Sequence, residues 1–279
     1  MNKLLKFLTA SAVACATVVG YTAPRSSPVP ASKAPIASTT LQPVVLRIVT
    51  EDFPPFQTLH NGEIVGPMYS VMRAMCKEAR IECVIELMVW KDAYKQAIDG
   101  SADIVFSILL EVPERKELFH LSPSIVNTSY SFFVTSRNSW KYTGLQSLDG
   151  IMLGAYGPSG TSIVAQDVVA DRLKAGLGQT PLTIEPSIVD SFQQLVIGKY
   201  GQSGAVVVNK DVGLSLLKKH SIVGPKVAGD IKQITYGFGF SKKSPNQEHF
   251  EPLVRALKTL QKRGDILDML RVYGLKASE

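Results

Sequence analysis

The sequence predicts an α/β protein with two similar lobes and a cleft between them. Hydrophobic runs and amphipathic helical stripes follow one another in β-α-β-α-β order, and the same order starts again in the second half of the chain. With 45% hydrophobic and 19% charged residues, the composition is that of a globular protein. The length of 279 residues suggests roughly two domains, at ~150 residues per domain.

Each element is predicted from its hydrophobic period. The predicted strands of the first unit are 44–50, 84–88 and 102–106, and its helices are 68–80 and 91–98. The second unit has predicted strands at 151–155, 182–185 and 205–208 and helices at 161–173 and 190–198. A helical turn at 114–119 and a strand at 129–134 join the units, and a strand at 235–240 with helices at 248–263 and 265–273 ends the chain.

The net charge of +6 does not indicate nucleic-acid binding. Lys3, Lys6, Arg25 and Lys33 lie in the N-terminal segment, and the other basic residues alternate with acidic ones. After residue 22, no uncharged apolar run approaches the length of a membrane span. The four His are scattered and no Cys or His spacing is that of a zinc site, so no metal and no cofactor is expected.

The N-terminus has the pattern of a secretory signal. A short basic segment precedes an apolar stretch and small residues, which predicts a signal peptide over 1–16, followed by a Pro/Ala/Ser-rich linker over 17–43. Two forms of processing are open: cleavage after Ala16, or lipidation of Cys15 and tethering to a membrane. Export places the chain in an oxidising compartment, where Cys76 and Cys83 can form a disulfide across a helix-to-strand turn; two buried free thiols are the alternative.

The order of several short motifs resembles a known family. The Phe53-Pro54-Pro55-Phe56 turn comes first, the strand 102–105 is followed by Pro113-Glu114-Arg115, and the chain ends with a 240–244 to 271–275 tail. This order resembles that of the extracytoplasmic solute-binding proteins of family 3, the receptors of polar amino acid ABC importers. The resemblance implies a two-lobed periplasmic-binding-protein fold, type II-like, with each lobe a mixed sheet flanked by helices.

The resemblance also implies the lobe limits. The first lobe would comprise 44–136 plus 232–279 and the second 137–231. The two crossings, near 134–138 and 230–234, would form the hinge over a ligand cleft.

Candidate binding residues come from the resemblance and from local chemistry. The resemblance implies that Arg115 holds a ligand carboxylate; a surface ion pair with Glu114 or Glu117 is the alternative. Ser159, Gly160 and Thr161 open a predicted helix, where an anion is favoured, although simple N-capping by Ser159 is also open.

Three further candidates lie near the expected cleft. Phe53 and Trp90 would form an aromatic wall, with core packing as the alternative. Ser107 follows a predicted strand at the edge where open α/β sheets bind ligands.

Two positions depart from the amino-acid-binding pattern of the family. Leu110 stands where a hydroxyl residue is usual, and Asn209 stands where an Asp usually pairs the α-ammonium of the ligand. An Asn weakens that charge-assisted contact, which is worth ~1.5–3 kcal/mol. Glu111, Asp52 or Glu51 would replace it if one of them faces the cleft.

The sequence therefore predicts a periplasmic, monomeric binding protein and no enzyme. It would capture a small polar, amino-acid-like or anionic solute and present it to the membrane permease of an ABC importer. One alternative is an exported cyclohexadienyl dehydratase-like enzyme, with Glu111 or Glu185 as its acid. The other is an orphan or sensory binding protein without a cognate transporter.

Overall fold

The computed structural model of the chain describes Gly20 and residues 44–278. The predicted signal peptide over 1–16, the linker over 17–43 and the lipidation candidate Cys15 lie outside this part, apart from Gly20. None of the helices within the described residues is both long and apolar enough to traverse a lipid bilayer.

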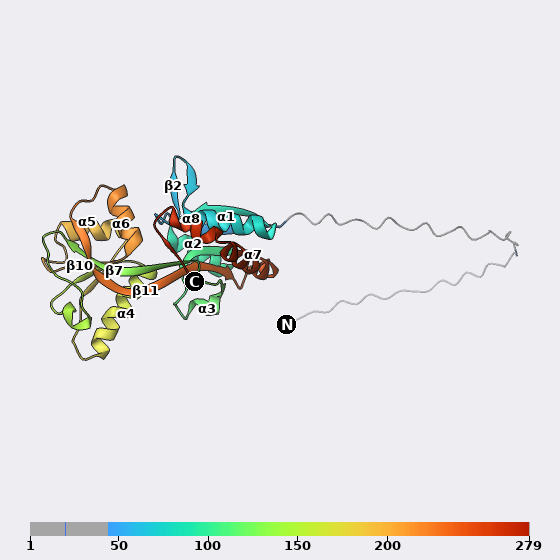
Figure 1. The fold of residues 1–279 in the computed structure, drawn as a ribbon. Coiled ribbons are helices and arrows are strands. Elements are labelled where there is room, and N and C mark those ends of the chain that lie inside the picture. Colours follow the sequence, from blue (N-terminus) through green and yellow to red (C-terminus); the bar gives the residue numbers. More distant parts are fainter. Residues whose placement is uncertain (1–19, 21–43, 279) are drawn as a thin grey trace, which may run out of the picture. The chain divides into compact units, whose positions relative to one another are not determined.

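One large sheet runs through the described domain (Figure 1). In spatial order its strands are β4 (Glu82–Leu87), β1 (Val45–Thr50), β5 (Ile104–Leu109), β11 (Pro225–Ser241), β7 (Val126–Thr135), β10 (Ala205–Asn209), β8 (Leu153–Tyr156) and β9 (Leu182–Glu185). The short strand β6 (Phe119–Leu121) pairs with β11, and β12 (Lys276–Ala277) pairs with β7. A separate hairpin joins β2 (Thr58–His60) to β3 (Glu63–Val65).

The sheet is divided between two lobes, each with parallel strands covered by helices. Strands β4, β1 and β5 are parallel in the first lobe, and β10, β8 and β9 are parallel in the second. The first lobe carries α1 (Pro67–Ala79), α2 (Trp90–Asp99), α3 (Arg115–Leu118), α7 (Phe250–Arg263) and α8 (Asp265–Arg271). The second carries η1 (Leu145–Leu148), α4 (Gly160–Lys174), α5 (Ile188–Val196) and α6 (Lys210–Lys219), and η2 (Gln247–His249) precedes α7.

Both faces of the inner strands of the first-lobe sheet, β1 and β5, are buried. Successive residues of a strand point to opposite faces, so Ile48 joins the core under α1 while Val49 joins a smaller core under α2. This explains why the parallel strands are almost continuously apolar in sequence.

Strands β7 and β11 pass from one lobe to the other. β7 pairs with β12 at residues 126–127 and with β10 at residues 130–133. Its partner on this side therefore changes near residues 128–129. β11 pairs with β7 from Pro225 to Tyr236 and with β5 from Tyr236 to Phe240, so its pairing partner changes at Tyr236.

A disulfide joins Cys76 of α1 to Cys83 of β4. The connection between the two elements is tight, because Arg80 ends α1 in the left-handed conformation, with φ 58°. The bond closes the helix-to-strand turn that the sequence placed between the two cysteines.

Candidate functional site

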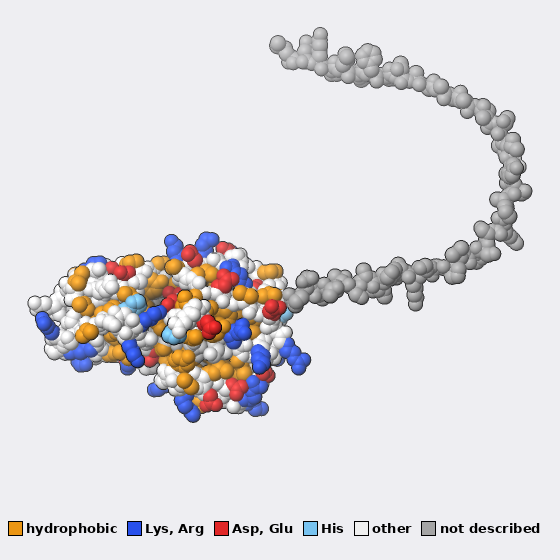
Figure 2. All heavy atoms as spheres, turned by 90° about the horizontal axis from the view of Figure 1, so that it is seen from above, with side chains coloured by type: hydrophobic (Ala, Val, Ile, Leu, Met, Phe, Trp, Pro, Cys, Tyr) orange, Lys and Arg blue, Asp and Glu red, His pale blue; other side chains and the backbone are white. Residues whose placement is uncertain are grey.

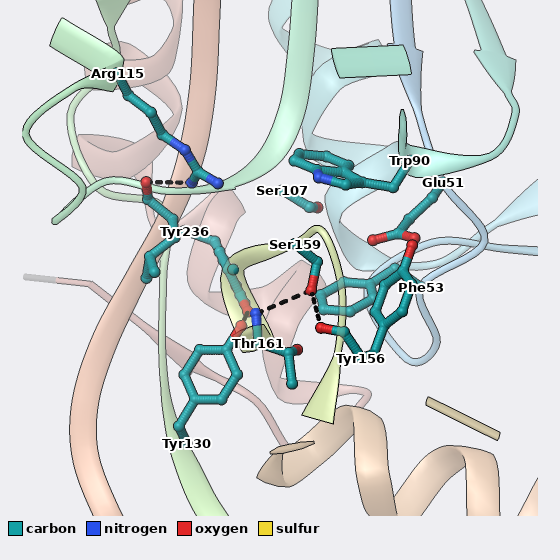
Figure 3. Close-up of a pocket in the computed structure, with 12 residues that line it drawn as sticks. Glu51, Phe53, Trp90, Ser107, Arg115, Tyr130, Tyr156, Ser159, Thr161 and Tyr236 are labelled. Carbon is teal, nitrogen blue, oxygen red and sulfur yellow. Dashed lines mark hydrogen bonds between the residues drawn. The ribbon is translucent and has the colours of Figure 1, made fainter. Parts of the chain in front are cut away.

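A pocket lies between the lobes, at the carboxyl ends of β1, β5 and β8 (Figure 3). Ligands of open α/β sheets bind at such strand ends. The residues that line it are Glu51, Phe53, Trp90, Ser107, Leu109, Arg115, Tyr130, Tyr156, Ser159, Gly160, Thr161 and Tyr236. Its free volume is about 20 Å³ because side chains of both lobes meet there.

The structure brings together seven of the eight residues that the sequence nominated for ligand binding. These are Phe53, Trp90, Ser107, Arg115, Ser159, Gly160 and Thr161. The eighth, Asn209, is buried outside the pocket. Glu51, which also lines the pocket, was one of three acids that the sequence left open, and the sequence did not nominate Leu109, Tyr130, Tyr156 or Tyr236.

Arg115 reaches the pocket from the start of α3 and is only 3% exposed. One guanidinium nitrogen donates to the carbonyl oxygen of Leu109, whereas Nε is buried without a hydrogen-bond partner. The charge lies over the rings of Trp90 and Tyr94, 6.0 and 5.7 Å from the ring centroids. Among the described residues, no carboxylate forms an ion pair with Arg115. It is therefore a buried cation with unused hydrogen-bonding capacity beside the pocket.

Ser107 is an extra residue in β5. Phe106 pairs with Phe238 and Ile108 with Gly237, so Ser107 has no partner on β11 and adopts φ 57°. An extra residue of this kind forms a β-bulge, which redirects a side chain and is common next to active sites. Its hydroxyl donates to Oε1 of buried Gln57 at 2.7 Å.

The bulge also shifts the alternation of the strand. Val105 and Ile108 pack in the same small core, although they are three positions apart. Leu109 lines the pocket, whereas Leu110 lies outside it and against the backbone of Gly237. The resemblance expected a hydroxyl residue at position 110. Near that position the pocket is lined by an apolar side chain, and this side chain belongs to Leu109 and not to Leu110.

Phe53 and Trp90 form the aromatic side of the pocket. Phe53 stacks on Phe56 with ring centroids 5.6 Å apart and meets the edge of Tyr236 at 5.8 Å. Trp90 is the first residue of α2 and stacks on Tyr94 at 5.5 Å. Both side chains pack in the core and also present a surface to the pocket.

The second lobe contributes the N-terminal end of α4. Oγ of Ser159 accepts from the backbone N–H of Thr161 at 3.1 Å and donates to the carbonyl oxygen of Tyr156 at 2.8 Å. Ser159 and Ser162 complete a capping box. A Cβ at Gly160 would lie 3.1 Å from the Tyr130 hydroxyl, so glycine keeps this wall of the pocket open. The helix end carries partial positive charge and faces the same pocket as Arg115.

Glu51 and Tyr156 meet across the pocket from the ends of β1 and β8 (Figure 3). Burial raises the pKa of Glu51 to about 8, the hydrogen bond from Tyr156 partly opposes this, and the charge of Asp52 adds to it. Desolvation and the charge of Glu51 raise the pKa of Tyr156. At neutral pH the pocket thus holds one guanidinium and one largely protonated carboxyl group.

Asn209 supports the pocket from behind. Its Oδ1 caps α6 by accepting from the N–H of Val212 at 3.1 Å, and its Nδ2 donates to Thr128 at 3.1 Å and to the Tyr236 hydroxyl at 3.3 Å. The Tyr236 hydroxyl lies 3.2 Å from that of Tyr130. The amide therefore orients pocket tyrosines and does not itself reach the pocket.

Two larger hollows adjoin this pocket and share residues with it. One, of about 530 Å³, is lined in part by Glu51, Phe53 and Tyr156, and the other, of about 670 Å³, in part by Trp90, Arg115 and Ser159. Basic, acidic and apolar side chains are interspersed on the face seen in Figure 2. Within residues 44–278, no group of three or more His, Cys, Asp and Glu is arranged to hold a metal ion.

Comparison with known proteins assigns the family. The sequence matches the bacterial extracellular solute-binding proteins, family 3, over residues 46–276, and the chain belongs to this family. No curated protein sequence matches it.

Solved structures share the fold at low sequence identity. A histidine kinase sensor domain with similarity to periplasmic binding proteins superimposes with a TM-score of 0.71 at 17% identity, over 84% of this chain and 98% of the other. The arginine-, lysine-, histidine-binding protein ArtJ of Geobacillus stearothermophilus gives 0.68 at 19%, over 82% and 95%. An ancestral amino acid-binding protein, a precursor of cyclohexadienyl dehydratase, gives 0.66 at 18%, over 82% and 94%.

Proposed function

We propose that this chain is a periplasmic receptor that captures a small polar solute carrying a carboxylate and delivers it to the permease of an ABC importer. The predicted signal peptide supports export. The family and the pocket between the lobes support capture of a small solute. The amino acids bound by solved relatives support a carboxylate-bearing one.

The observation that carries this proposal is the state of Arg115. A buried guanidinium without a counter-ion costs several kcal/mol. Here it also keeps a buried Nε without an acceptor and shares its pocket with the N-terminal end of α4. A ligand carboxylate would supply the missing acceptor and the missing charge together.

A thermal-shift screen tests the proposal. The described domain would be screened against amino acids, polyamines, small dicarboxylates, sugars and prephenate. At ~100 times the Kd, a ligand of the native state adds about 2.7 kcal/mol, which raises the Tm by several degrees. We expect a carboxylate hit that Arg115→Met abolishes. A hit that survives this substitution, or a response to sugars alone, would contradict the proposal.

A second candidate function is a dehydratase, and Glu51 is the observation that favours it. Elimination of a hydroxyl group needs a protonated carboxylic acid in the pocket. The acids nominated from sequence are engaged elsewhere: Glu111 accepts from Thr235, and Glu185 accepts from Lys199 and Tyr200, each at 2.7 Å. Turnover of prephenate by the purified protein, lost in Glu51→Gln, would support the enzyme over the receptor.

A further inference from the structure

The pocket needs an acidic group if its ligand carries an ammonium, and the sequence left three acids open. The structure separates them. Glu111 is exposed and accepts from both the N–H and the hydroxyl of Thr235 at 2.7 Å. Asp52 pairs with Lys219 at 2.8 Å and does not line the pocket. Glu51 alone of the three lines it.

Asn209 cannot receive an ammonium group of the ligand. Its oxygen and its nitrogen are both occupied by the cap of α6, Thr128 and Tyr236, and the side chain is fully buried. The second lobe and the crossing strands contribute hydroxyl groups to the pocket, and no carboxylate.

The surroundings of Glu51 suit a cation. Phe53, Trp90 and Tyr156 line the same pocket, and aromatic faces attract cations electrostatically. Several charged and titratable groups lie near its carboxyl. Arg115, Tyr130 and Tyr156 line the same pocket, and Asp52 is its neighbour in sequence and is partly neutralised by Lys219. Lys219 and His220 of α6 line an adjoining hollow together with Glu51. Among the described residues no cation forms an ion pair with Glu51, and an ammonium group would provide that partner.

We propose that Glu51 is the specificity-determining residue of the pocket and receives an ammonium group of the ligand. The ligand is then a zwitterion, with its carboxylate at Arg115 and its ammonium at Glu51. This inference rests on the proposed receptor function and places the ammonium contact on the first lobe, in place of the acid that Asn209 lacks.

Binding then moves a proton. In the pocket, Glu51 is largely protonated at pH 7, because burial raises its pKa to about 8. A neighbouring ammonium favours the carboxylate, so the carboxyl O–H bond breaks and its proton passes to the buffer. The ligand keeps its own charge.

Titration calorimetry of the screened zwitterion tests this. The zwitterion and its analogue with hydrogen in place of the amine would be titrated at pH 7 in two buffers of different ionisation enthalpy. The proteins are the wild type, Glu51→Gln and, as a matched control, Glu63→Gln on the exposed start of β3. We expect the wild type and the control to prefer the zwitterion and to release a fraction of a proton. In Glu51→Gln, the affinity for the zwitterion falls roughly 10- to 100-fold and the proton release disappears.

The outcomes separate this inference from the function on which it rests. If Glu51→Gln binds the zwitterion as well as the wild type, or if the deaminated analogue binds equally well, the inference is wrong while a receptor that depends on Arg115 stands. If Arg115→Met binds unchanged, the receptor function falls and the inference falls with it.

Discussion

Arg115 and Arg172 are equally buried, at 3% exposure each, and replacement of each by Met separates a binding charge from a structural one. Arg172 donates to the carbonyl oxygens of Leu145 and Gln179 at 3.2 Å and to Asp149 at 3.1 Å. Arg172→Met leaves two part-buried carbonyls without a donor, at up to ~1–3 kcal/mol each, and Asp149 without its ion-pair partner. We expect a loss of about 3 kcal/mol or more.

In Arg115→Met, the losses and gains in the free energy of unfolding differ from those in Arg172→Met. It leaves one carbonyl, that of Leu109, without a donor, but it removes a buried charge that has no counter-ion and an Nε that has no acceptor. Such a charge costs several kcal/mol, so the two changes roughly cancel. In a domain of this size, 1 kcal/mol corresponds to about 2–4 °C in Tm. We expect Arg172→Met to lower the Tm of the ligand-free protein by at least ~6 °C and Arg115→Met to change it by less than ~4 °C.

Differential scanning calorimetry of the two variants, with circular dichroism to confirm folding, makes the comparison. The ligand-induced shift should be lost only in Arg115→Met. If Arg115→Met is as unstable as Arg172→Met, the guanidinium of Arg115 is structural and the argument for a ligand carboxylate fails.

Three other predictions concern closure and the pocket walls. Folded Glu51 holds its proton up to about pH 8, whereas the unfolded residue releases it near the ordinary pKa of 4.5, so the stability contributed by this group falls as pH rises between these values. In urea denaturation, the free energy of unfolding of Glu51→Gln should therefore rise relative to that of the wild type between pH 5 and pH 8. An equal difference between the two proteins at both pH values would contradict this. Lys219→Ala breaks an ion pair with Asp52 in which the side chains are 39% and 44% exposed, so we expect ligand affinity to fall by less than about 5-fold, and a loss above 10-fold would refute it. Gly160→Ala places a methyl 3.1 Å from the Tyr130 hydroxyl and should weaken binding in calorimetry without lowering the Tm, since Ala favours the helix.

Much of the fold follows from sequence because periodicity and burial agree in its parallel strands and long helices. Helix α6 and the β2–β3 hairpin are among the elements that were not predicted. Helix α6 contains Gly213, a poor helix former, where a side chain would collide with Phe133. The β2–β3 hairpin has short strands, although Asn61 and Gly62, both with positive φ, form the two-residue turn that hairpins favour.

The sequence identifies some residues of the candidate site and not others. Motif-borne residues such as Arg115 and Ser159 could be nominated because their neighbours in sequence identify them. Tyr130 and Tyr236 could not be nominated, because they lie inside long strands whose apolar pattern predicts core residues. They reach the pocket only because β7 and β11 cross between the lobes there. Glu51 could be named as a candidate but not distinguished from Asp52, since adjacent residues after a strand differ only in the side to which they point.

These positions also suggest how closure and recognition are coupled. Arg115 and Glu51 both belong to the first lobe, and the elements that cover them, α4 and Tyr156, belong to the second. Closing the empty protein therefore buries a guanidinium without a counter-ion and forces a carboxyl group to take up a proton, and both changes oppose closure. A zwitterion of matching length removes both penalties, whereas a simple carboxylate removes one. Because a ligand shifts a conformational equilibrium only by its differential affinity for the two states, we expect zwitterions to close the lobes more completely than carboxylates of the same size.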